Sequence, residues 1–305
     1  MEPSLLIIGS PRCGTTWMYR TLQQHPDVLV PLDKETDFFY HHKWMQKLGL
    51  KGYHALFVDA QGNPPADPAG KVAVESCPQY CKLDRGMIQK LHTLYPEIRI
   101  MQSIREPVSR TWSLVSRMRI DRPITDEAEL KRQLPAILRH VEKARVWRCN
   151  DYAAIIDRWQ PVFGNRFKFI VFDDLKKDAD AFRSDFLGFV GVDPAWTPPV
   201  DQHKSATDRN IQMPELFAWY VATQSIEMVR RLNEKFDGRV DGWVEKLEGY
   251  LGQTTPTRRL MRWVNQHLLT VPERVAYSFY AGHRVRARNR VMADMIRDYR
   301  QPSGS

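Results

Sequence analysis

The sequence has no uninterrupted apolar stretch approaching the ~20 residues that a membrane-spanning helix needs. Its first apolar run, at residues 5–8, starts so close to Met1 that no secretory signal fits before it. With 43% hydrophobic and 27% charged residues, the composition is that of a globular protein with a buried core. We therefore expect a cytoplasmic protein, or one bound peripherally to the inner face of a membrane.

Cysteine is also scarce, and its spacing argues against the usual cysteine-based scaffolds. The four cysteines are Cys13, Cys77, Cys81 and Cys149, and no two of them form a Cys-x-x-Cys pair. This spacing favours free thiols over a zinc site or a disulfide framework.

Acidic residues are few only at the C-terminal end. The chain has a formal net charge of +9, and from residue 251 onward there are ten arginines, no lysine and three acidic residues. The first 250 residues are therefore close to neutral. A general nucleic-acid binder should be basic over its main domain, so we expect no nucleic-acid partner. We divide the chain into a domain at residues 1–250 and a basic helical extension at 251–305.

The most informative stretch is residues 4–17. An apolar run breaks at Gly9 into a short loop that ends in Gly14, and a helix-compatible pattern follows. In such a strand, loop and helix, backbone N–H groups point at an anion, usually a phosphate. The Gly9-x-x-x-x-Gly14 spacing is that of a P-loop, but Thr15 stands where a P-loop has lysine. A kinase or NTPase normally needs that lysine, and the nearest cation here is Arg12.

The rest of the chain alternates short apolar runs with helical patterns. Strands are predicted at 28–31, 71–75, 98–104 and 167–172, and helices at 83–94, from 108, at 126–146, at 151–163 and through 182–190. This alternation predicts an α/β fold of three layers, with a central, mostly parallel sheet and helices on both faces. Ligands bind at the carboxyl ends of strands in such sheets. The Gly9 loop, Glu35, Glu75 and Arg105 lie just past predicted strand ends, so we expect them to share one cleft.

Several motifs together resemble one enzyme family. Residues 11–17, Pro-Arg-Cys-Gly-Thr-Thr-Trp, resemble the 5′-phosphosulfate-binding loop of sulfotransferases that use 3′-phosphoadenosine-5′-phosphosulfate (PAPS). Arg105 followed eight residues later by Ser113 resembles their 3′-phosphate-binding strand and helix. Residues 25–39, which include Lys-Glu-Thr-Asp-Phe-Phe, resemble the acceptor-side segment of the Golgi heparan-sulfate branch and of many bacterial members. Residues 172–175 are similar to a strand end common in these enzymes, and the resemblance spans about residues 4–192.

The resemblance implies a fold related to that of nucleotide kinases and an enzyme that binds PAPS, needs no metal and releases 3′-phosphoadenosine-5′-phosphate. The sulfuryl group would go to a hydroxyl, in preference to an amine, of a carbohydrate, lipid or small-molecule acceptor. Arg12 would neutralise the leaving group, and Arg105 and Ser113 would hold the 3′-phosphate. The implied 5′-phosphate loop comprises Arg12, Cys13, Gly14, Thr15, Thr16 and Trp17.

The resemblance assigns the general base to Glu35. An exposed ion pair with Lys34 is the structural alternative for Glu35, and the adjacent His41 and His42 are rival bases. Glu75 either supports the base, touches the acceptor or is purely structural. Two departures disfavour a heparan-type acceptor, since Asp37 and Ser76 stand where that branch tends to have His and Lys. Lys204 is a weak candidate for covering the donor.

The sequence leaves two alternatives open, one for the role of the basic tail and one for the function of the protein. The basic tail is either a solvated helical face on the main domain or an amphipathic segment that binds an anionic membrane or acceptor. Its arginines among apolar residues are Arg258, Arg259, Arg262, Arg284, Arg286, Arg288 and Arg290. For function, the alternatives to a sulfotransferase are a P-loop-type kinase or NTPase and a catalytically inactive nucleotide-binding protein of the same fold.

Overall fold

The computed structural model describes residues 1–116, 129, 132–133, 136–137, 141, 144–200, 212–252, 286 and 288–297. The chain forms two compact units. We call the first the sheet unit; it comprises Met1–Ile104, Ile155–Ser205 and Gly282–Ser305. We call the second the helical unit; it comprises Arg105–Ala154 and Ala206–Ala281.

The sheet unit is built on one sheet, whose described strands run in the order β3-β2-β4-β1-β5-β6. The strands are β1 (Leu5–Ile7), β2 (Val28–Pro31), β3 (Phe57–Val58), β4 (Val72–Ser76), β5 (Arg99–Ile104) and β6 (Phe167–Val171). All the paired strands are parallel except β2 and β3. The central strand β1 pairs Leu5 with Val74 on one side and with Arg99 on the other. Strands buried on both faces read as largely apolar runs, which is why all of these strands except β3 could be predicted.

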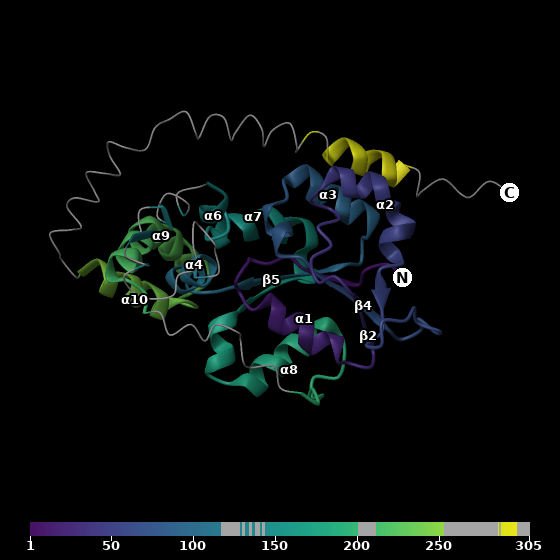
Figure 1. Ribbon diagram of the computed structural model, residues 1–305, viewed down its shortest axis with the longest axis horizontal. Coiled ribbons are helices and arrows are strands. Elements are labelled where there is room, and N and C mark those ends of the chain that lie inside the picture. Colours follow the sequence, from purple (N-terminus) through teal and green to yellow (C-terminus); the bar gives the residue numbers. More distant parts are fainter. Residues whose placement is uncertain are drawn as a thin grey trace. The chain divides into compact units, whose positions relative to one another are not determined.

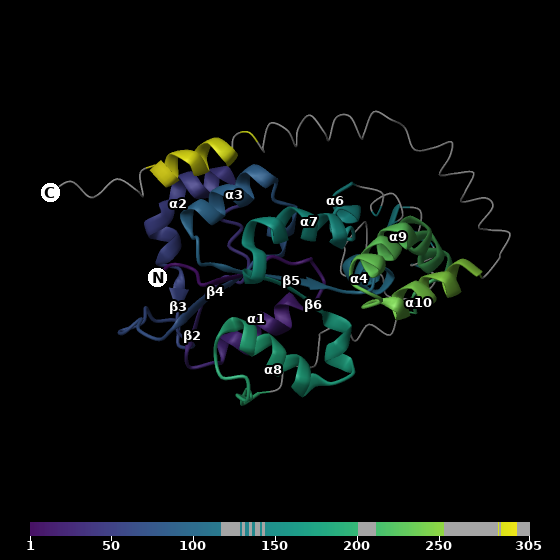
Figure 2. The ribbon, with the colours of Figure 1, turned by 180° about the vertical axis from the view of Figure 1, so that it is seen from behind.

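Helices cover both faces of this sheet (Figures 1 and 2). One face carries α1 (Thr15–Gln23) and α8 (Ala179–Val190), and the other carries α2 (His42–His54), α3 (Arg85–Leu94) and residues 155–163 of α7 (Tyr152–Phe163). The apolar side of α1 packs on α8, where Trp17 lies edge-on to Phe182 with ring centroids 5.6 Å apart. Apolar positions spaced by three and four residues produce this contact face. The predicted α/β architecture is confirmed.

The helical unit is organised around α4 (Pro107–Val115), α9 (Glu215–Lys235) and α10 (Asp241–Gly252), with the short α6 (Ala144–Trp147). Helix α4 starts with proline at its first position, and the Glu106 carboxylate accepts hydrogen bonds from the N–H groups of Val108 (2.6 Å) and Ser109 (3.0 Å). Both features favour a helix start. Helix α9 packs against α4 and α10.

Part of the basic tail belongs to the sheet unit. Figures 1 and 2 show the helical residues 288–297 (yellow) alongside α2 and α3. Arg288 is buried, forms an ion pair with Asp84 at the start of α3 and lies over the Tyr40 ring, 5.6 Å from its centroid. This arginine therefore binds the protein itself. The tail arginines at 258, 259, 262 and 284 lie outside the described residues, so the membrane hypothesis stays a prediction.

Some elements of the structure were not predicted, and some predictions concern residues that the structure does not describe. No helix or strand was predicted at residues 40–70, but these residues contain α2 and β3, and α2 is interrupted at Gly49 (φ 64°). Most of the predicted helix at 126–146, the region of Lys204 and residues 253–285 of the predicted extension lie outside the described residues. Residues 251–252, at the start of that extension, are the end of α10. Among the described helices, none combines the length and apolar character needed to cross a bilayer.

Candidate active site

The glycine-rich loop between β1 and α1 has the geometry of an anion-binding turn. Gly14 takes the left-handed conformation (φ 80°) immediately before α1, and Arg12 is also left-handed (φ 71°). The N–H groups of the first helical turn have no partners within the helix, so a helix start of this kind attracts an anion. The Thr16 side chain is exposed and the Thr15 side chain is buried, so the two hydroxyls differ in their access to a ligand.

The loop is held on one side by strand β5 and on the other by the 3₁₀ turn Pro78–Lys82, which follows β4. The Ser10 N–H donates to the carbonyl of Ser103 (2.7 Å), and the Ser103 hydroxyl donates to the carbonyl of Cys13 (2.5 Å). On the other side, the Cys81 N–H donates to the Ile8 carbonyl (2.8 Å). The Cys13 N–H donates within the loop to the Ser10 carbonyl (3.2 Å), and the Cys13 side chain is fully buried. The loop is therefore preorganised by main-chain contacts.

The remaining predicted loop residue, Trp17, contributes its side chain to the core. Its indole is 9% exposed and packs against Phe182 and Phe186 of α8. This packing fixes α1 relative to the sheet, and with it the position of the helix start that follows Gly14.

Gly14 is required for a second reason besides its dihedral angle. A Cβ atom at this position would lie 1.9 Å from Cε2 of Phe172, the residue that follows β6. The Phe172 ring therefore packs directly on the loop backbone, so the first residue of the 172–175 motif contacts the glycine loop.

Gly14→Ala should destabilise the protein by ~2 kcal/mol, because the ring must move and the backbone is strained. Gly70→Ala is the matched control, since Gly70 has a similar φ (73°) with no atom within 4 Å of the added Cβ. Denaturant unfolding should show a clearly larger loss for Gly14→Ala than for Gly70→Ala. Equal losses would show that the contact with Phe172 does not matter.

Glu35 lies on the segment that follows β2. Its side chain is 43% exposed and forms an ion pair with Lys34, with 2.6 Å between Nζ and Oε1. The structure thus contains the predicted ion pair and also leaves the carboxylate accessible. Of the rival bases, His41 lies 3.8 Å from the Asp37 carboxylate and is 44% exposed, and His42 begins α2.

Glu75 was predicted to lie just past a strand end, and this prediction is wrong. It lies within β4, and its side chain is fully buried. Its carboxylate accepts hydrogen bonds from the hydroxyls of Thr36, Tyr53 (2.5 Å) and Tyr80 (2.8 Å). Burial raises the pKa of Glu75 to about 7, although the three hydroxyl groups lower it. Sequence reasoning missed these partners, and the only signal was an acidic residue in an apolar run.

The end of β4 links the two candidate segments of the sheet unit. The Ser76 hydroxyl donates to the carbonyl of Thr15 in α1 (3.3 Å), while the Cys77 thiol donates to the Asp37 carboxylate (3.1 Å). Because β1, β2 and β4 are parallel neighbours, their carboxyl ends meet at one edge. The glycine loop and the Glu35 segment therefore lie at the same edge of the sheet.

Arg105 and Ser113 belong to the helical unit. The half-buried Arg105 lies between the end of β5 and Glu106, the residue that caps α4. Its main chain is held by Tyr152, whose hydroxyl donates to the Arg105 carbonyl (2.7 Å). Ser113 lies on α4 four residues after Ser109, so the two serines share a face of the helix. Glu106, the predicted alternative partner of Arg105, caps α4 and pairs with Lys246 (3.0 Å).

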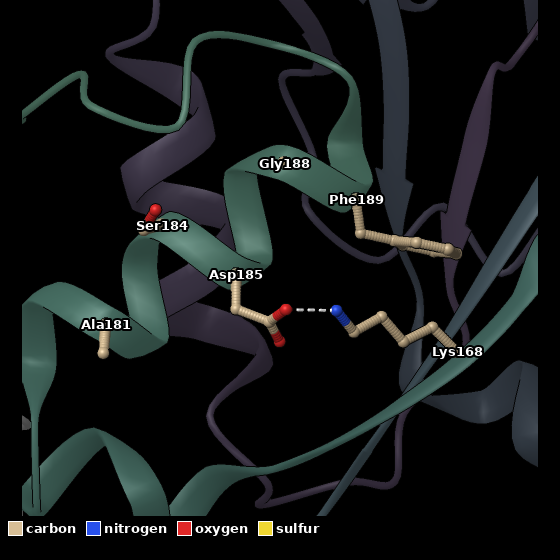
Figure 3. Close-up of a pocket in the computed structure, with 6 residues that line it drawn as sticks. All are labelled: Lys168, Ala181, Ser184, Asp185, Gly188 and Phe189. Atoms are coloured by element: carbon tan, nitrogen blue, oxygen red, sulfur yellow. Dashed lines mark hydrogen bonds and ion pairs between the residues drawn. The ribbon is translucent and has the colours of Figure 1, made fainter.

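A surface pocket at β6 and α8 is formed by other residues (Figure 3). Lys168 of β6 reaches toward α8 and forms an ion pair with Asp185. The pocket is lined by Lys168, Ala181, Ser184, Asp185, Gly188 and Phe189, which include none of the predicted site residues. Within the described part of the chain, no group of three or more His, Cys, Asp or Glu side chains is placed to hold a metal ion.

The segment that carries the glycine loop matches one protein family. Residues 3–85 match the Sulfotransferase family. The match contains the loop, Glu35 and Glu75, and it ends before Arg105. Among curated proteins, none matches the sequence significantly.

Solved sulfotransferase structures resemble the chain. A sulfotransferase from Alicyclobacillus acidocaldarius has a TM-score of 0.58 and 23% identity, with 80% of this chain and 99% of that chain covered. This likeness shows a shared fold. The sulfotransferase domain of the olefin synthase of Synechococcus PCC 7002 has a TM-score of 0.46 and 17% identity, covering 75% of this chain and 94% of that one. A sulfotransferase domain from the curacin biosynthetic pathway has a TM-score of 0.45 and 19% identity, and the match covers 66% of this chain and 78% of that one.

Proposed function

We propose that the protein is a sulfotransferase that moves the sulfuryl group of PAPS to a hydroxyl of a carbohydrate, lipid or small-molecule acceptor. The observation that carries the proposal is the loop from Gly9 to Gly14. Its last residue, Gly14, is left-handed and immediately precedes α1, and Thr15 stands where a P-loop has lysine. The loop lies within the segment that matches the Sulfotransferase family. Nothing in the comparisons favours a kinase or NTPase.

The residues of the loop fit the donor's 5′ side. The α1 N-terminus and the exposed Thr16 hydroxyl suit a 5′-phosphate. PAPS supplies an activated sulfuryl group, and its transfer requires alignment and relief of charge on the leaving oxygen. Arg12 would provide that charge as a guanidinium, which can hold two oxygens but does not act as a proton donor.

Glu35 would accept the proton of the attacking hydroxyl. A general base must be able to reach the acceptor, and the Glu35 carboxylate is accessible to solvent while it pairs with Lys34. Arg105 and Ser113 would bind the 3′-phosphate, the group that distinguishes this donor from ATP. No step of this scheme uses a metal ion.

A transfer assay over lipid, carbohydrate and phenolic hydroxyls tests the proposal. The purified protein is mixed with PAPS carrying a labelled sulfuryl group, and sulfated product is measured for each acceptor class. We expect product from at least one class without added metal. ATP-dependent phosphorylation of the same acceptors, with no sulfation, would contradict the proposal.

Arg105→Ala should weaken donor binding about 30-fold, which corresponds to ~2 kcal/mol for a lost charged hydrogen bond. Calorimetric titration with 3′-phosphoadenosine-5′-phosphate (PAP) measures this change. An analogue without the 3′-phosphate should bind both proteins equally. A loss of affinity for both ligands would show that Arg105 supports the fold and does not recognise the 3′-phosphate.

A further inference from the structure

Glu75 is a buried carboxylate for which the proposed reaction has no direct use. It lies in β4 with no exposed surface, and three hydroxyls from three different parts of the sheet unit donate to it. Thr36 follows β2, Tyr53 lies on α2, and Tyr80 lies in the 3₁₀ turn Pro78–Lys82. All three donors are neutral. A buried carboxylate is tolerated only when its hydrogen bonds are satisfied. The charge of Glu75 therefore keeps these three hydroxyls oriented toward its carboxylate as donors.

The same hydroxyls also hold the chain next to Glu35. The Phe38 N–H donates to the Thr36 hydroxyl oxygen (3.2 Å), and the Phe39 N–H donates to the Tyr80 hydroxyl oxygen (3.3 Å). Phe38 stacks on the Tyr53 ring with centroids 4.3 Å apart. Residues 36–39 are therefore fixed through groups that converge on Glu75, and Glu35 is the residue that immediately precedes them.

This arrangement depends on the ionised form of Glu75. A carboxylate accepts all three hydroxyl donors, whereas a protonated carboxyl must itself donate and so forces at least one hydroxyl to turn. The titratable groups that face Glu75 are Tyr53, Tyr80, Cys77 and Asp37. Burial raises the pKa values of the two tyrosines and of the thiol well above their usual range, so these three stay neutral. Burial is the main reason that the pKa of Glu75 is raised to about 7, and the charge of Asp37 also contributes to this rise.

We propose that Glu75 is a positioning residue for Glu35, and that its ionised carboxylate holds residues 36–39 in the arrangement that directs Glu35 to the acceptor. The inference rests on the proposed function. Glu75 itself touches neither donor nor acceptor, because it is fully buried. Turnover should therefore fall as the pH drops through about 7, where Glu75 becomes protonated.

Tyr53→Phe provides the test. It removes one donor to the charged form and keeps the ring that stacks on Phe38, so the pKa of Glu75 should rise. In the pH profile of kcat, the fall on the acid side (the acid limb) should then occur at a pH about one unit higher. Tyr95→Phe is the matched control, because it removes a hydroxyl that contacts His54 (2.7 Å) and is not among the groups that shift the pKa of Glu75. Its acid limb should stay in place.

Glu75→Gln serves as the second variant. Glutamine has nearly the same size but does not ionise, so kcat should be low at every pH and its acid limb near pH 7 should disappear. PAP binding should be unchanged in all these variants. A limb at the same pH in Tyr53→Phe as in the wild type, or one that persists in Glu75→Gln, would overturn the inference while leaving the proposed function intact. Failure of the wild-type protein to bind PAP or transfer the sulfuryl group would overturn both.

Discussion

Replacing Glu35 by glutamine lowers kcat by about 10²–10⁴-fold and leaves the affinity for PAP unchanged. The reason is that glutamine keeps the size and exposure of the side chain but takes no proton from the acceptor hydroxyl. Rates at saturating PAPS, measured with the acceptor found in the transfer assay, give this value.

Lys34→Ala is the control for this prediction. It breaks the same ion pair that Glu35→Gln breaks, but it keeps the carboxylate. An exposed pair of this kind stabilises a protein by at most about 1 kcal/mol. We therefore expect near-normal turnover in Lys34→Ala. Normal turnover in Glu35→Gln would show that Glu35 is only a surface ion-pair partner, and it would move the base to His41 or His42.

Replacing Arg12 by glycine lowers kcat by about 10²–10³-fold, the usual cost of losing one group that stabilises developing negative charge. Glycine is the informative substitution, because Arg12 has a φ of 71° that glycine adopts without strain. The free energy of unfolding should therefore stay within about 1 kcal/mol of the wild type. Parallel denaturant titrations and rate measurements separate the two effects.

Arg12→Lys completes the series. Lysine keeps the positive charge but not the planar fork, so it should recover part of the lost turnover. Equal turnover in the wild type and in Arg12→Gly would show that Arg12 has no part in the reaction. A loss of turnover that follows a loss of stability would assign it a structural role.

The parts of the site that could be predicted are local in sequence. The glycine loop follows from the spacing of Gly9 and Gly14 between an apolar run and a helical pattern, all within twenty residues. Its preorganisation could not be predicted, since it depends on Ser103 and Phe172, which only the folded sheet brings to the loop. The strands other than β3 were predictable because burial on both faces makes them largely apolar.

The hydroxyl groups that donate to Glu75 show that sequence reasoning does not predict contacts between residues far apart in the chain. The acidic residue was visible, but Thr36 and Tyr53 lie 39 and 22 positions away, and no periodicity connects them with β4. The same holds for Arg288, which pairs with Asp84 across 204 positions. No sequence feature predicts that the compact units divide after Ile104, because only Arg105 and Glu106 separate β5 from α4.

Thermal unfolding in the presence of PAP, compared with ATP and Mg²⁺, is the most direct test of the proposed donor. A ligand stabilises a protein only through the state that it binds, by about 2.7 kcal/mol at one hundred times its Kd. We predict that PAP raises the Tm without Mg²⁺, and that ATP with Mg²⁺ has little effect. Stabilisation by ATP and Mg²⁺ alone would contradict the assignment of the protein as a PAPS-dependent sulfotransferase.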